Sequence, residues 1–561
     1  MSQNPRRAAD DIVDTLTALG TRDIFTLCGN HVLPIQEALR TRDVRMIAMR
    51  SEASAVMAAD AYGRIARRVG VVVVTGGPGM SNTVTALLTA HGNRSPLVVI
   101  SGEPEQSNDG RGGQQETDHL GLSAPAVKWH RAVRRPDHVE ETLVEAFRVA
   151  QTGRTGPVHV TIPLDVQREP VDALDSAVDA ATVATGGPPP EFVRAAADLV
   201  RSAVRPVLVA GAGLWQAGGE DAVARLAGTT GLPVFTLDSA RGIIADSSPS
   251  AFGYADRSLN VVAESLTEAD VVLVVGRSID FRLGLGAAFS ERATVVHVDT
   301  DLAALGRNAR HVRAGLGDPA VFVADLADAL RDHRVDRAWP ARLEAARKDK
   351  TRQLAATLEG PGRLNHPGEV ARTIGLVGSA HKAIYALDCG EFVQWCRQVI
   401  PCEGPGRWLR LGPQSTCGAG LPFGLGAKVA SPDSPLIVIA GDGGIGYHIT
   451  ELETAVRHDI PLVVVVGEDQ GWGIERNLQN GIYGEGAEYT TQLNAVRLPQ
   501  VAEGFGARGV QVDDAQALGD ALKDALAQQK PTLIQVPVQT VPSTLTLGMI
   551  RRERTALRGG R

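Results

Sequence analysis

The stretch at residues 435–469, PLIVIAGDGGIGYHITELETAVRHDIPLVVVVGED, decides the fold of this chain. Two short runs rich in Val and Ile flank a polar segment with helical spacing, which indicates a strand, a helix and a second strand. Runs that are apolar throughout, rather than alternating, are typical of parallel strands covered on both faces. The stretch therefore predicts an α/β fold built on a parallel sheet.

The same pattern recurs along the chain, in VGVVVVTGG, PLVVISG, PVLVAGAG, ADVVLVVG, ATVVHVD and PTLIQVPV. At 561 residues the chain exceeds one ordinary hydrophobic core. Two linkers are expected, ATGGPPPE at 184–191 and a charged stretch near 336–365. We predict three doubly wound parallel-sheet domains over residues 1–183, 192–340 and 365–541, then a mobile basic tail over 542–561. The first and third domains could be distant structural relatives.

Composition excludes several classes of protein. A net charge of -7 without a long basic run argues against nucleic-acid binding. No apolar run reaches the roughly 18 to 20 residues of a spanning helix, and the N-terminus lacks an apolar signal core, so we expect a cytoplasmic protein without membrane contact. The five cysteines form no CxxC pattern, which favours reduced thiols over disulfides or zinc ligands.

Carboxylates follow both strands of the opening stretch. Asp442 lies between two glycines after the first strand, and Asp469 follows the second. Ligands of parallel sheets gather at the carboxyl ends of strands, and a glycine-rich helix start lets a phosphate approach the backbone. Two neighbouring carboxylates repel each other unless a cation lies between them, and Mg²⁺ shares oxygen ligands with phosphates. The alternative is that Asp442 caps a helix and Glu468-Asp469 is a solvated turn.

Further motifs surround this pair: RSEASAVMAADAYGRIARR, GRGGQQETDH, DCGEFVQW and STCGAGLPFGLGAKVA. With them, the chain resembles the thiamine diphosphate enzymes of the acetolactate synthase, pyruvate decarboxylase and benzaldehyde lyase superfamily over essentially its whole length. The resemblance implies a pyrimidine-binding, a central and a diphosphate-binding domain, in that order. It also implies thiamine diphosphate and Mg²⁺ as cofactors.

The resemblance assigns the diphosphate end of the cofactor to the third domain. Asp442, Asp469 and the backbone carbonyl of Gly471 would be metal ligands. Other cofactor-binding residues would be Gly390, Glu391, Gly443 and Gly444. One departure stands out, because Glu468-Asp469 occupies the place of the family's Asn-Asn and adds negative charge beside a diphosphate.

Three residues would contact the cofactor rings. Glu52 resembles the glutamate that hydrogen-bonds the aminopyrimidine, and otherwise it is an ordinary helix carboxylate. Cys417 would be the wedge between the rings, where a larger residue is commoner, and otherwise it is a plain buried thiol. The backbone carbonyl of Ser415 would accept from the amino group of the cofactor.

Three more residues would face the substrate. His31, in LCGNHVLPIQEAL, and Gln115 resemble active-site residues of the benzaldehyde lyase branch, with Gln115 bonding a substrate carbonyl and His31 relaying a proton. Glu475 lies where the pyruvate decarboxylase branch has a catalytic acid. The alternatives are a structural histidine and a surface helix charge.

The resemblance implies a transferase or lyase. It would decarboxylate a 2-oxo acid such as pyruvate and pass the acyl anion to a carbonyl acceptor, giving a 2-hydroxyketone or an acetolactate-type product. Cleavage of a 2-hydroxyketone or a 2-hydroxyacyl-CoA is the alternative, and a non-catalytic scaffold is a third. FAD or ADP in the central domain is possible but unsupported by its short GxG, so a structural domain is favoured. A homodimer or homotetramer with active sites between subunits is expected.

Overall fold

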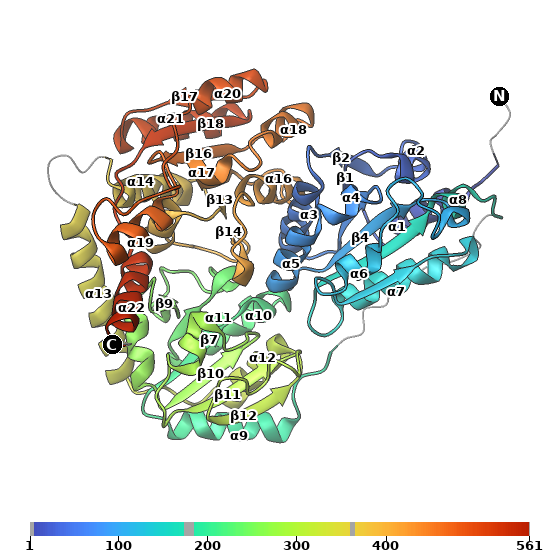
Figure 1. The fold of residues 1–561 in the computed structure, drawn as a ribbon. Coiled ribbons are helices and arrows are strands. Elements are labelled where there is room, and N and C mark those ends of the chain that lie inside the picture. The colour runs from blue at the N-terminus through green and yellow to red at the C-terminus, as the bar shows by residue number, and fades with distance from the viewer. Residues whose placement is uncertain (1–4, 173–184, 359–364, 560–561) are drawn as a thin grey trace. The chain divides into compact units, whose positions relative to one another are not determined.

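The computed structural model describes residues 5–172, 185–358 and 365–559. The described strands form three six-stranded sheets, and all neighbouring strands within them run parallel (Figure 1). The chain folds into two compact units: the first comprises Met1–Ala184, Leu411–Asp433 and His448–Pro461, and the second comprises the rest. The predicted α/β class of three parallel sheets is confirmed.

The N-terminal sheet lies in the first unit, with strand order β2-β1-β3-β4-β6-β5. Strands β3 and β4 are buried along their whole length, as their continuous apolar runs predict. The strands are β1 (Asp23–Thr26), β2 (Arg45–Ala48), β3 (Gly70–Val74), β4 (Leu97–Glu103), β5 (Trp129–Ala132) and β6 (Pro157–Pro163). The helices are α1 (Ala8–Ala18), α2 (Leu33–Leu39), α3 (Glu52–Ala66), α4 (Pro78–Ser81), α5 (Val84–Asn93), α6 (His119–Ser123), α7 (Val139–Gln151) and α8 (Leu164–Arg168).

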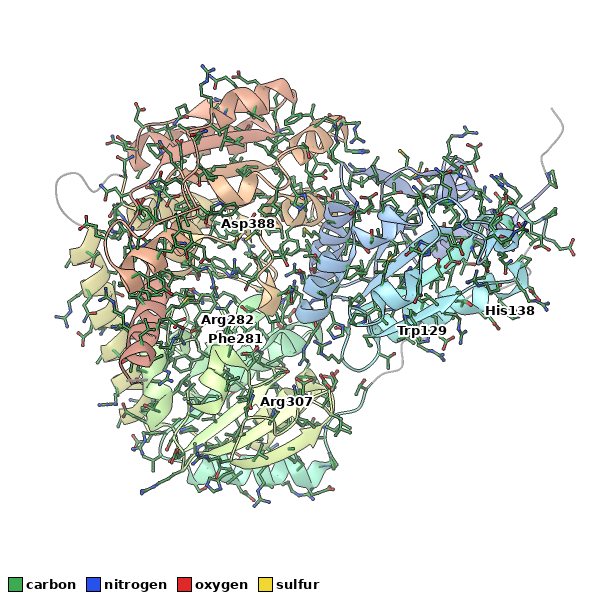
Figure 2. All side chains as sticks on the ribbon, in the orientation of Figure 1. Trp129, His138, Phe281, Arg282, Arg307 and Asp388 are labelled. Atoms are coloured by element: carbon green, nitrogen blue, oxygen red, sulfur yellow. The ribbon has the colours of Figure 1, made fainter. Side chains whose placement is uncertain are left out.

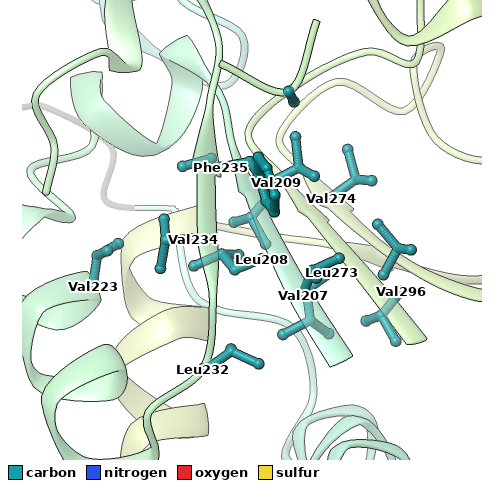
Figure 3. Close-up of a cluster of buried hydrophobic side chains, with 14 of the residues drawn as sticks. Val207, Leu208, Val209, Val223, Leu232, Val234, Phe235, Leu273, Val274 and Val296 are labelled. Carbon is teal, nitrogen blue, oxygen red and sulfur yellow. The ribbon is translucent and has the colours of Figure 1, made fainter. Parts of the chain in front are cut away.

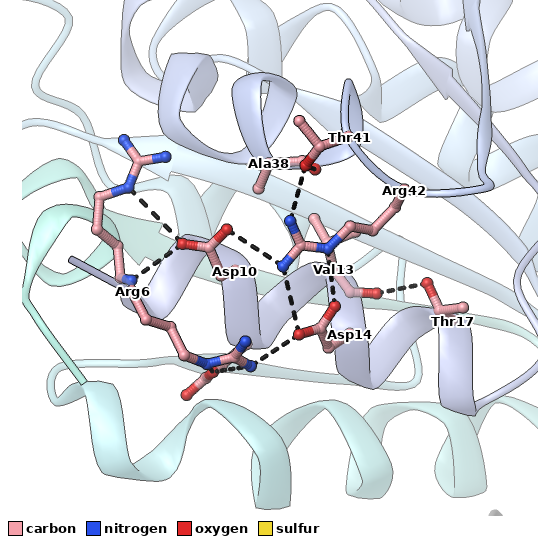
Figure 4. Close-up of polar contacts among 10 residues, drawn as sticks. Arg6, Asp10, Val13, Asp14, Thr17, Ala38, Thr41 and Arg42 are labelled. Carbon is pink, nitrogen blue, oxygen red and sulfur yellow. Dashed lines mark hydrogen bonds and ion pairs between the residues drawn. The ribbon is translucent and has the colours of Figure 1, made fainter. Parts of the chain in front are cut away.

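An ion-pair network fastens the start of α1 (Figure 4). Arg6 Nη2 lies 2.7 Å from Asp14 Oδ2, and Arg42 Nε lies 2.9 Å from Asp14 Oδ1. Arg6 also contacts Asp11, whose carboxylate is almost fully buried. Because most of these groups remain partly exposed, we expect each pair to stabilise the fold by no more than about 1 kcal/mol.

Helix α16 (Gly420–Ala430) belongs to the first unit and packs against α3. The helices approach so closely that a Cβ at Gly426 would overlap the backbone carbonyl of Ala58. The buried guanidinium of Arg64 is 2.7 Å from Asp60 and 4.6 Å from the centre of the Phe423 ring. Glycine at position 426 therefore permits a close helix pair.

The central sheet, in the second unit, has the order β12-β11-β10-β7-β8-β9. Read from its other edge, this is the doubly wound order 3-2-1-4-5-6. Val and Leu of β7 and β10 fill its core together with Phe235 (Figure 3). The strands are β7 (Pro206–Ala210), β8 (Val234–Thr236), β9 (Ala251–Tyr254), β10 (Val271–Val275), β11 (Thr294–Asp299) and β12 (His311–Leu316), and the main helices are α9 (Pro190–Ser202), α10 (Ala212–Gln216), α11 (Glu220–Thr230) and α12 (Pro319–Ala329).

The C-terminal sheet, also in the second unit, has the order β14-β13-β15-β16-β18-β17. Numbered from its own first strand, this is the order 2-1-3-4-6-5 of the N-terminal sheet, which agrees with the expected kinship of the two. The strands are β13 (Ile384–Leu387), β14 (Trp408–Leu409), β15 (Leu436–Gly441), β16 (Val463–Glu468), β17 (Arg508–Gln511) and β18 (Thr532–Pro537). The remaining helices of this part of the chain are α14 (Pro367–Ala380), α15 (Glu391–Val399), α17 (Asp442–Ile445), α18 (Glu451–Arg457), α19 (Gly473–Tyr483), α20 (Leu498–Gly504) and α21 (Ala515–Gln528).

Two predictions are corrected. The charged stretch near 336–365, predicted as a linker, is helix α13 (Ala338–Leu358) where it is described, and Trp339 and Leu343 are buried. The tail predicted to be mobile is helix α22 (Thr544–Gly559), which packs on α19 with Ile550 against Gly481. In both cases a few apolar anchors hold a segment whose overall composition is charged. The first predicted linker, 184–191, lies partly outside the described residues, and from Pro190 it is helix α9.

In the described part of the chain, no helix combines the length and the apolar character needed to cross a membrane.

Candidate active site

The predicted site residues divide between the two units, and in the first unit they gather around the turn after β3. A Cβ at Gly76 would lie 3.3 Å from His31 Nδ1, and one at Gly79 would lie 3.8 Å from Glu52 Oε1. At Gly77, whose φ is +59°, a Cβ would come within 2.6 Å of Gln115 Cβ. The structure therefore brings Glu52, His31 and Gln115 to one glycine turn, where a larger residue at 77 would overlap Gln115 and one at 76 would crowd His31.

His31 lies in a short 3₁₀ helix, Asn30–Val32, and its side chain is buried. Burial lowers the pKa of His31, the nearby His119 lowers it further, and a side-chain hydrogen bond with Gln115 partly opposes both effects. The ring nitrogen Nδ1 is 3.3 Å from the Thr75 hydroxyl, and the His31 carbonyl accepts from Gln167. A neutral imidazole held in this way can accept a proton near neutral pH.

Gln115 contacts His31 from a loop that adopts an unusual backbone conformation. Its φ is 62°, a region that non-glycine residues rarely occupy. Glu116 stabilises this loop, because its carboxylate accepts from the amides of Gly110, Gly112 and Gly113 at 2.6–2.9 Å. His31 and Gln115, each predicted to face the substrate, are therefore in contact with each other.

Sequence reasoning missed His119, which is fully buried beside the same turn. Its Nε2 accepts from the Gly77 amide at 2.7 Å, so its proton lies on Nδ1, which faces Glu103 Oε1 at 3.4 Å. Glu103 in turn is 2.9 Å from Arg134. A chain of three side chains thus fixes the backbone between His31 and Gln115. The only sequence signal for it was the final histidine of the motif GRGGQQETDH.

Glu52 is the first residue of α3 and is half-buried. Its Oε2 accepts from Asn82 Nδ2 at 3.1 Å, and Oε1 faces Gly79. One carboxylate oxygen is therefore held by the protein while the helix start orients the other. This geometry suits a carboxylate that must present one oxygen to a ligand.

Ser415 and Cys417 lie in the loop before α16, which belongs to the first unit. Ser415 is exposed with φ 54°, and Cys417 is half-buried. Between them, the Thr416 hydroxyl bonds the Thr89 hydroxyl of α5 at 2.7 Å, and Gly412 fits against Asn93. The loop is thus fastened to α5 before Ser415 and again between the two predicted residues.

A cavity of about 710 Å³ opens beside this region, at the carboxyl ends of β1 and β2. Its lining comes from the residues that lead into His31 and Glu52, namely Thr26, Leu27, Cys28, Met46, Ala48, Met49 and Arg50, with Gln36 and Arg457.

In the second unit, Asp442 and Asp469 follow the neighbouring parallel strands β15 and β16, as predicted. Asp442 accepts from the amides of Gly443 at 2.9 Å and Gly471 at 3.2 Å, so both strand-end loops meet at its carboxylate. Burial and then the charge of Asp469 raise the pKa of Asp442 to about 6, although these amide bonds oppose the rise. The two carboxylates are therefore close enough to repel each other.

Asp469 is also held by Arg476, which lies 2.7 Å from its Oδ2. Burial nevertheless raises the pKa of Asp469 above its ordinary value, because Arg476 only partly offsets the loss of solvent and the nearby charge of Glu391. Glu468 is half-buried at the last position of β16 and its carbonyl accepts from Val538. Glu475, on the first turn of α19, is exposed.

The glycines predicted to hold a diphosphate lie close to bulky groups. A Cβ at Gly443 would be 3.0 Å from the Trp472 ring, and one at Gly444 would be 3.4 Å from the carboxylate carbon of Asp388, which Figure 2 labels. Gly390 has φ +107° and directly precedes α15. Crowding by Trp472 favours glycine at 443 and the positive φ favours it at 390, and backbone amides lie at the starts of α15 and α17.

The side chain of Glu391, a residue predicted to bind the cofactor, makes hydrogen bonds within the protein. The buried carboxylate accepts from Asn477 Nδ2 at 3.0 Å, the Ser543 amide at 2.8 Å and the Thr546 hydroxyl at 2.8 Å. It thereby ties α15 to α19 and to the start of α22. This leaves the backbone at the start of α15 as its means of contacting a diphosphate.

In the central sheet, Gly211 and Gly213 of the GxG motif pack against the backbone and side chains of neighbouring residues. A Cβ at Gly211 would overlap Arg277, and the Gly213 amide donates to the Gly276 carbonyl at 2.9 Å. Arg277 is buried and paired with Asp238 at 2.8 Å and Asp280 at 2.6 Å.

The strand ends of the C-terminal sheet fit a divalent cation and a diphosphate. Two half-buried carboxylates, of which Asp469 raises the pKa of Asp442, are stabilised by a hard cation between them. In the described residues no group of three or more His, Cys, Asp and Glu side chains has metal-binding geometry, so such a cation would need further oxygen ligands. Backbone carbonyls and phosphate oxygens are the ligands that Mg²⁺ commonly adds.

Comparison with known proteins identifies three matched segments. Residues 6–122 match the family model of the thiamine pyrophosphate enzyme N-terminal TPP binding domain, residues 193–326 match the central domain, and residues 388–536 match the C-terminal TPP binding domain.

Whole-chain relatives have two kinds of names. The chain is 33% identical to the acetolactate synthase large subunit of Parasynechococcus marenigrum, over 94% of this chain and 87% of that protein. It is 30% identical to the acetolactate synthase large subunit IlvG of Mycobacterium tuberculosis, over 94% of each chain. It is also 30% identical to 2-hydroxyacyl-CoA lyase 2 of Danio rerio, over 94% of this chain and 90% of that protein.

Proposed function

Because the chain belongs to the thiamine pyrophosphate enzyme family, we propose that it is a carboligase that decarboxylates a 2-oxo acid and transfers the acyl unit to a carbonyl acceptor. The product would be a 2-hydroxyketone or an acetolactate-type acid, with pyruvate as the simplest donor. The observation that carries the proposal is the meeting of Asp442 and Asp469 at adjacent strand ends, with the Gly471 amide on Asp442.

We assign Mg²⁺ to Asp442, Asp469 and the backbone carbonyl of Gly471. The amides at the starts of α15 and α17, from Gly390, Glu391, Gly443 and Gly444, would bind the diphosphate, since helix starts favour anions. Thiamine diphosphate, when bound, supplies a carbon nucleophile that amino-acid side chains lack. The protein contributes orientation and proton transfer.

Glu52 would hold a proton at Oε1, shared with a ring nitrogen of the cofactor, while Asn82 fixes Oε2. Ser415 would accept a hydrogen bond at its carbonyl, and Cys417 would fill space between the rings. His31 would accept or return the proton of the substrate hydroxyl at a ring nitrogen, and Gln115 would donate to the substrate carbonyl. Glu475 is a further candidate acid, exposed on α19.

A cleavage reaction is the second candidate, because 2-hydroxyacyl-CoA lyase 2 of Danio rerio matches 94% of the chain, the same share as the two synthases. His31 and Gln115 would serve cleavage as well as synthesis, since the same groups act in both directions.

Product analysis tests these alternatives. The purified protein, with thiamine diphosphate and Mg²⁺, is mixed with 2-oxo acids and a panel of aldehydes, and separately with 2-hydroxyacyl-CoA thioesters, and products are identified by mass spectrometry. Release of CO₂ with a new 2-hydroxyketone supports carboligation, whereas aldehyde release from a 2-hydroxyacyl-CoA supports the lyase. Neither product in any mixture would contradict both.

We further propose a homodimer or homotetramer in the cytoplasm, with each active site completed by a second subunit. Sedimentation of the purified protein tests the assembly.

A further inference from the structure

Arg476 lies at the edge of the candidate metal site without being one of its predicted ligands. It is in the first turns of α19, and its guanidinium is largely buried. Its Nη2 donates to Asp469 Oδ2 at 2.7 Å, to the Asp469 carbonyl at 2.8 Å and to the Thr540 hydroxyl at 2.9 Å. One nitrogen therefore binds both the side chain and the backbone of Asp469.

The backbone at Gly471 packs against the same guanidinium. A Cβ at Gly471 would lie 3.0 Å from Arg476 Nη1 and 2.5 Å from the Thr491 carbonyl. Arg476 thus wraps the loop from Asp469 to Gly471, which supplies two of the three proposed metal ligands. A larger residue at 471 would push the guanidinium away.

The charges around this loop explain why a cation is needed there. Three carboxylates lie along this loop: the charge of Asp469 raises the pKa of Asp442, and the charge of Glu391 raises the pKa of Asp469. Arg476 is the basic side chain that pairs with Asp469 in the described structure. A buried carboxylate left without such a partner would be strongly destabilised.

The hydrogen bonds of Asp469 resemble those that an amide would make. An asparagine presents one oxygen to a metal and keeps a nitrogen for hydrogen bonding. In Asp469, Oδ2 is occupied by Arg476, and no side chain of the described residues donates to Oδ1. One oxygen thus remains for a ligand, and the pair of Asp469 and Arg476 carries no net charge.

We propose that Asp469 and Arg476 act as a neutral pair that replaces the neutral side chain expected at this ligand position. Arg476 is then a positioning residue for the metal ligand Asp469, and it offsets a charge that would otherwise repel the diphosphate. This inference rests on the proposed function, because it concerns the site assigned to Mg²⁺ and thiamine diphosphate.

Binding measured by calorimetry on the full-length protein tests the pair, with thiamine diphosphate as the titrant in saturating Mg²⁺. For Arg476→Gln we expect the dissociation constant of thiamine diphosphate to rise about tenfold or more, because Asp469 loses its close charge partner. For Asp469→Asn we expect a change within about threefold. The double variant should return to within about threefold of the wild type, because removing both charges restores neutrality.

The outcomes separate the two proposals. If the wild-type protein shows no Mg²⁺-dependent binding, the proposed function fails and this inference fails with it. If the wild type binds but the double variant stays as weak as Arg476→Gln, only the neutral-pair inference is overturned, because a purely structural arginine would not be rescued by Asp469→Asn.

Two further variants serve as controls for the Arg476→Gln measurement. Arg508→Gln is the matched control, since the half-buried Arg508 of β17 pairs with the exposed Asp524 of α21, and its binding should equal that of the wild type. Should Arg476→Gln fail to fold, Arg476→Lys keeps the charge and three donors on one nitrogen, and it should bind within about threefold of the wild type. A tenfold loss in Arg476→Lys would contradict the charge argument.

Discussion

The N-terminal and C-terminal sheets have the same strand order, 2-1-3-4-6-5, yet they carry different chemistry at the carboxyl ends of their strands. After its third strand the N-terminal sheet has the turn at Gly76 and Gly77, which packs against His31, His119 and Gln115. After the equivalent strand the C-terminal sheet has Asp442. The first edge is equipped to move protons, and the second to hold charge.

The comparison teaches that strand order fixes where a site forms but not what it does. The fourth strands make the same point, because β4 ends in Glu103, which orients a histidine, whereas β16 leads into Asp469, which faces Asp442. In both sheets glycines after the third strand allow the close approach. The residues that follow the strands then decide the chemistry.

The largest effect is expected from Glu52→Gln, near the strand ends of the N-terminal sheet. Loss of its proton should lower kcat by about a thousandfold or more, while thiamine diphosphate binding stays nearly unchanged. Steady-state kinetics and calorimetry measure the two quantities. Glu37→Gln, an exposed glutamate of α2, is the control and should retain full activity. Unchanged turnover in Glu52→Gln would remove the assigned role of this residue.

Asp442→Ala tests the carboxylates that follow the strands of the C-terminal sheet. The variant keeps one carboxylate where two are needed, so Mg²⁺-dependent thiamine diphosphate binding should weaken about a hundredfold. Calorimetry with and without EDTA measures it, and Asp520→Ala, an exposed residue of α21, is the control. Equal binding by both variants would show that the metal lies elsewhere.

His119→Ala should have an intermediate effect, since His119 acts through the Gly77 amide rather than on the substrate. We expect kcat to fall about tenfold with KM changed less, and His119→Gln, which keeps an acceptor, to recover part of the loss. The exposed His138, labelled in Figure 2, supplies the control His138→Ala. A His119→Gln variant as slow as His119→Ala would argue against the hydrogen bond.

The smallest effect concerns stability without metal. The folded pKa of Asp442, about 6, exceeds the value of 3.8 for an ordinary aspartate, so the folded state binds more protons between these limits. Stability is therefore greatest below about pH 4 for this group and is lost as pH rises through 6, by at most about 3 kcal/mol. Thermal unfolding in EDTA at several pH values measures it. Asp442→Asn should lose this part of the pH dependence, and a slope identical to that of the wild type would assign it to another group.

The parallel sheets were predictable because runs such as VVVV in β3 and β16 are apolar on both faces. Asp442 and Asp469 were predictable because adjacent parallel strands bring their carboxyl ends together. His119 and Arg476 were not, since each acts through a contact formed only after folding, with the Gly77 amide and with Asp469. The helices α13 and α22 were missed because charged residues outnumber their few buried anchors.

The close packing of α3 on α16 has a consequence for the origin of the chain. Each helix follows the second strand of its sheet, so the two are counterparts that meet face to face. Such a contact between equivalent elements is what a symmetric pair of identical small proteins would make. Gene duplication followed by fusion would produce this arrangement, and each copy was then free to acquire a separate task. Gly426, which has no side chain to separate the helices, would maintain the original contact between the two copies.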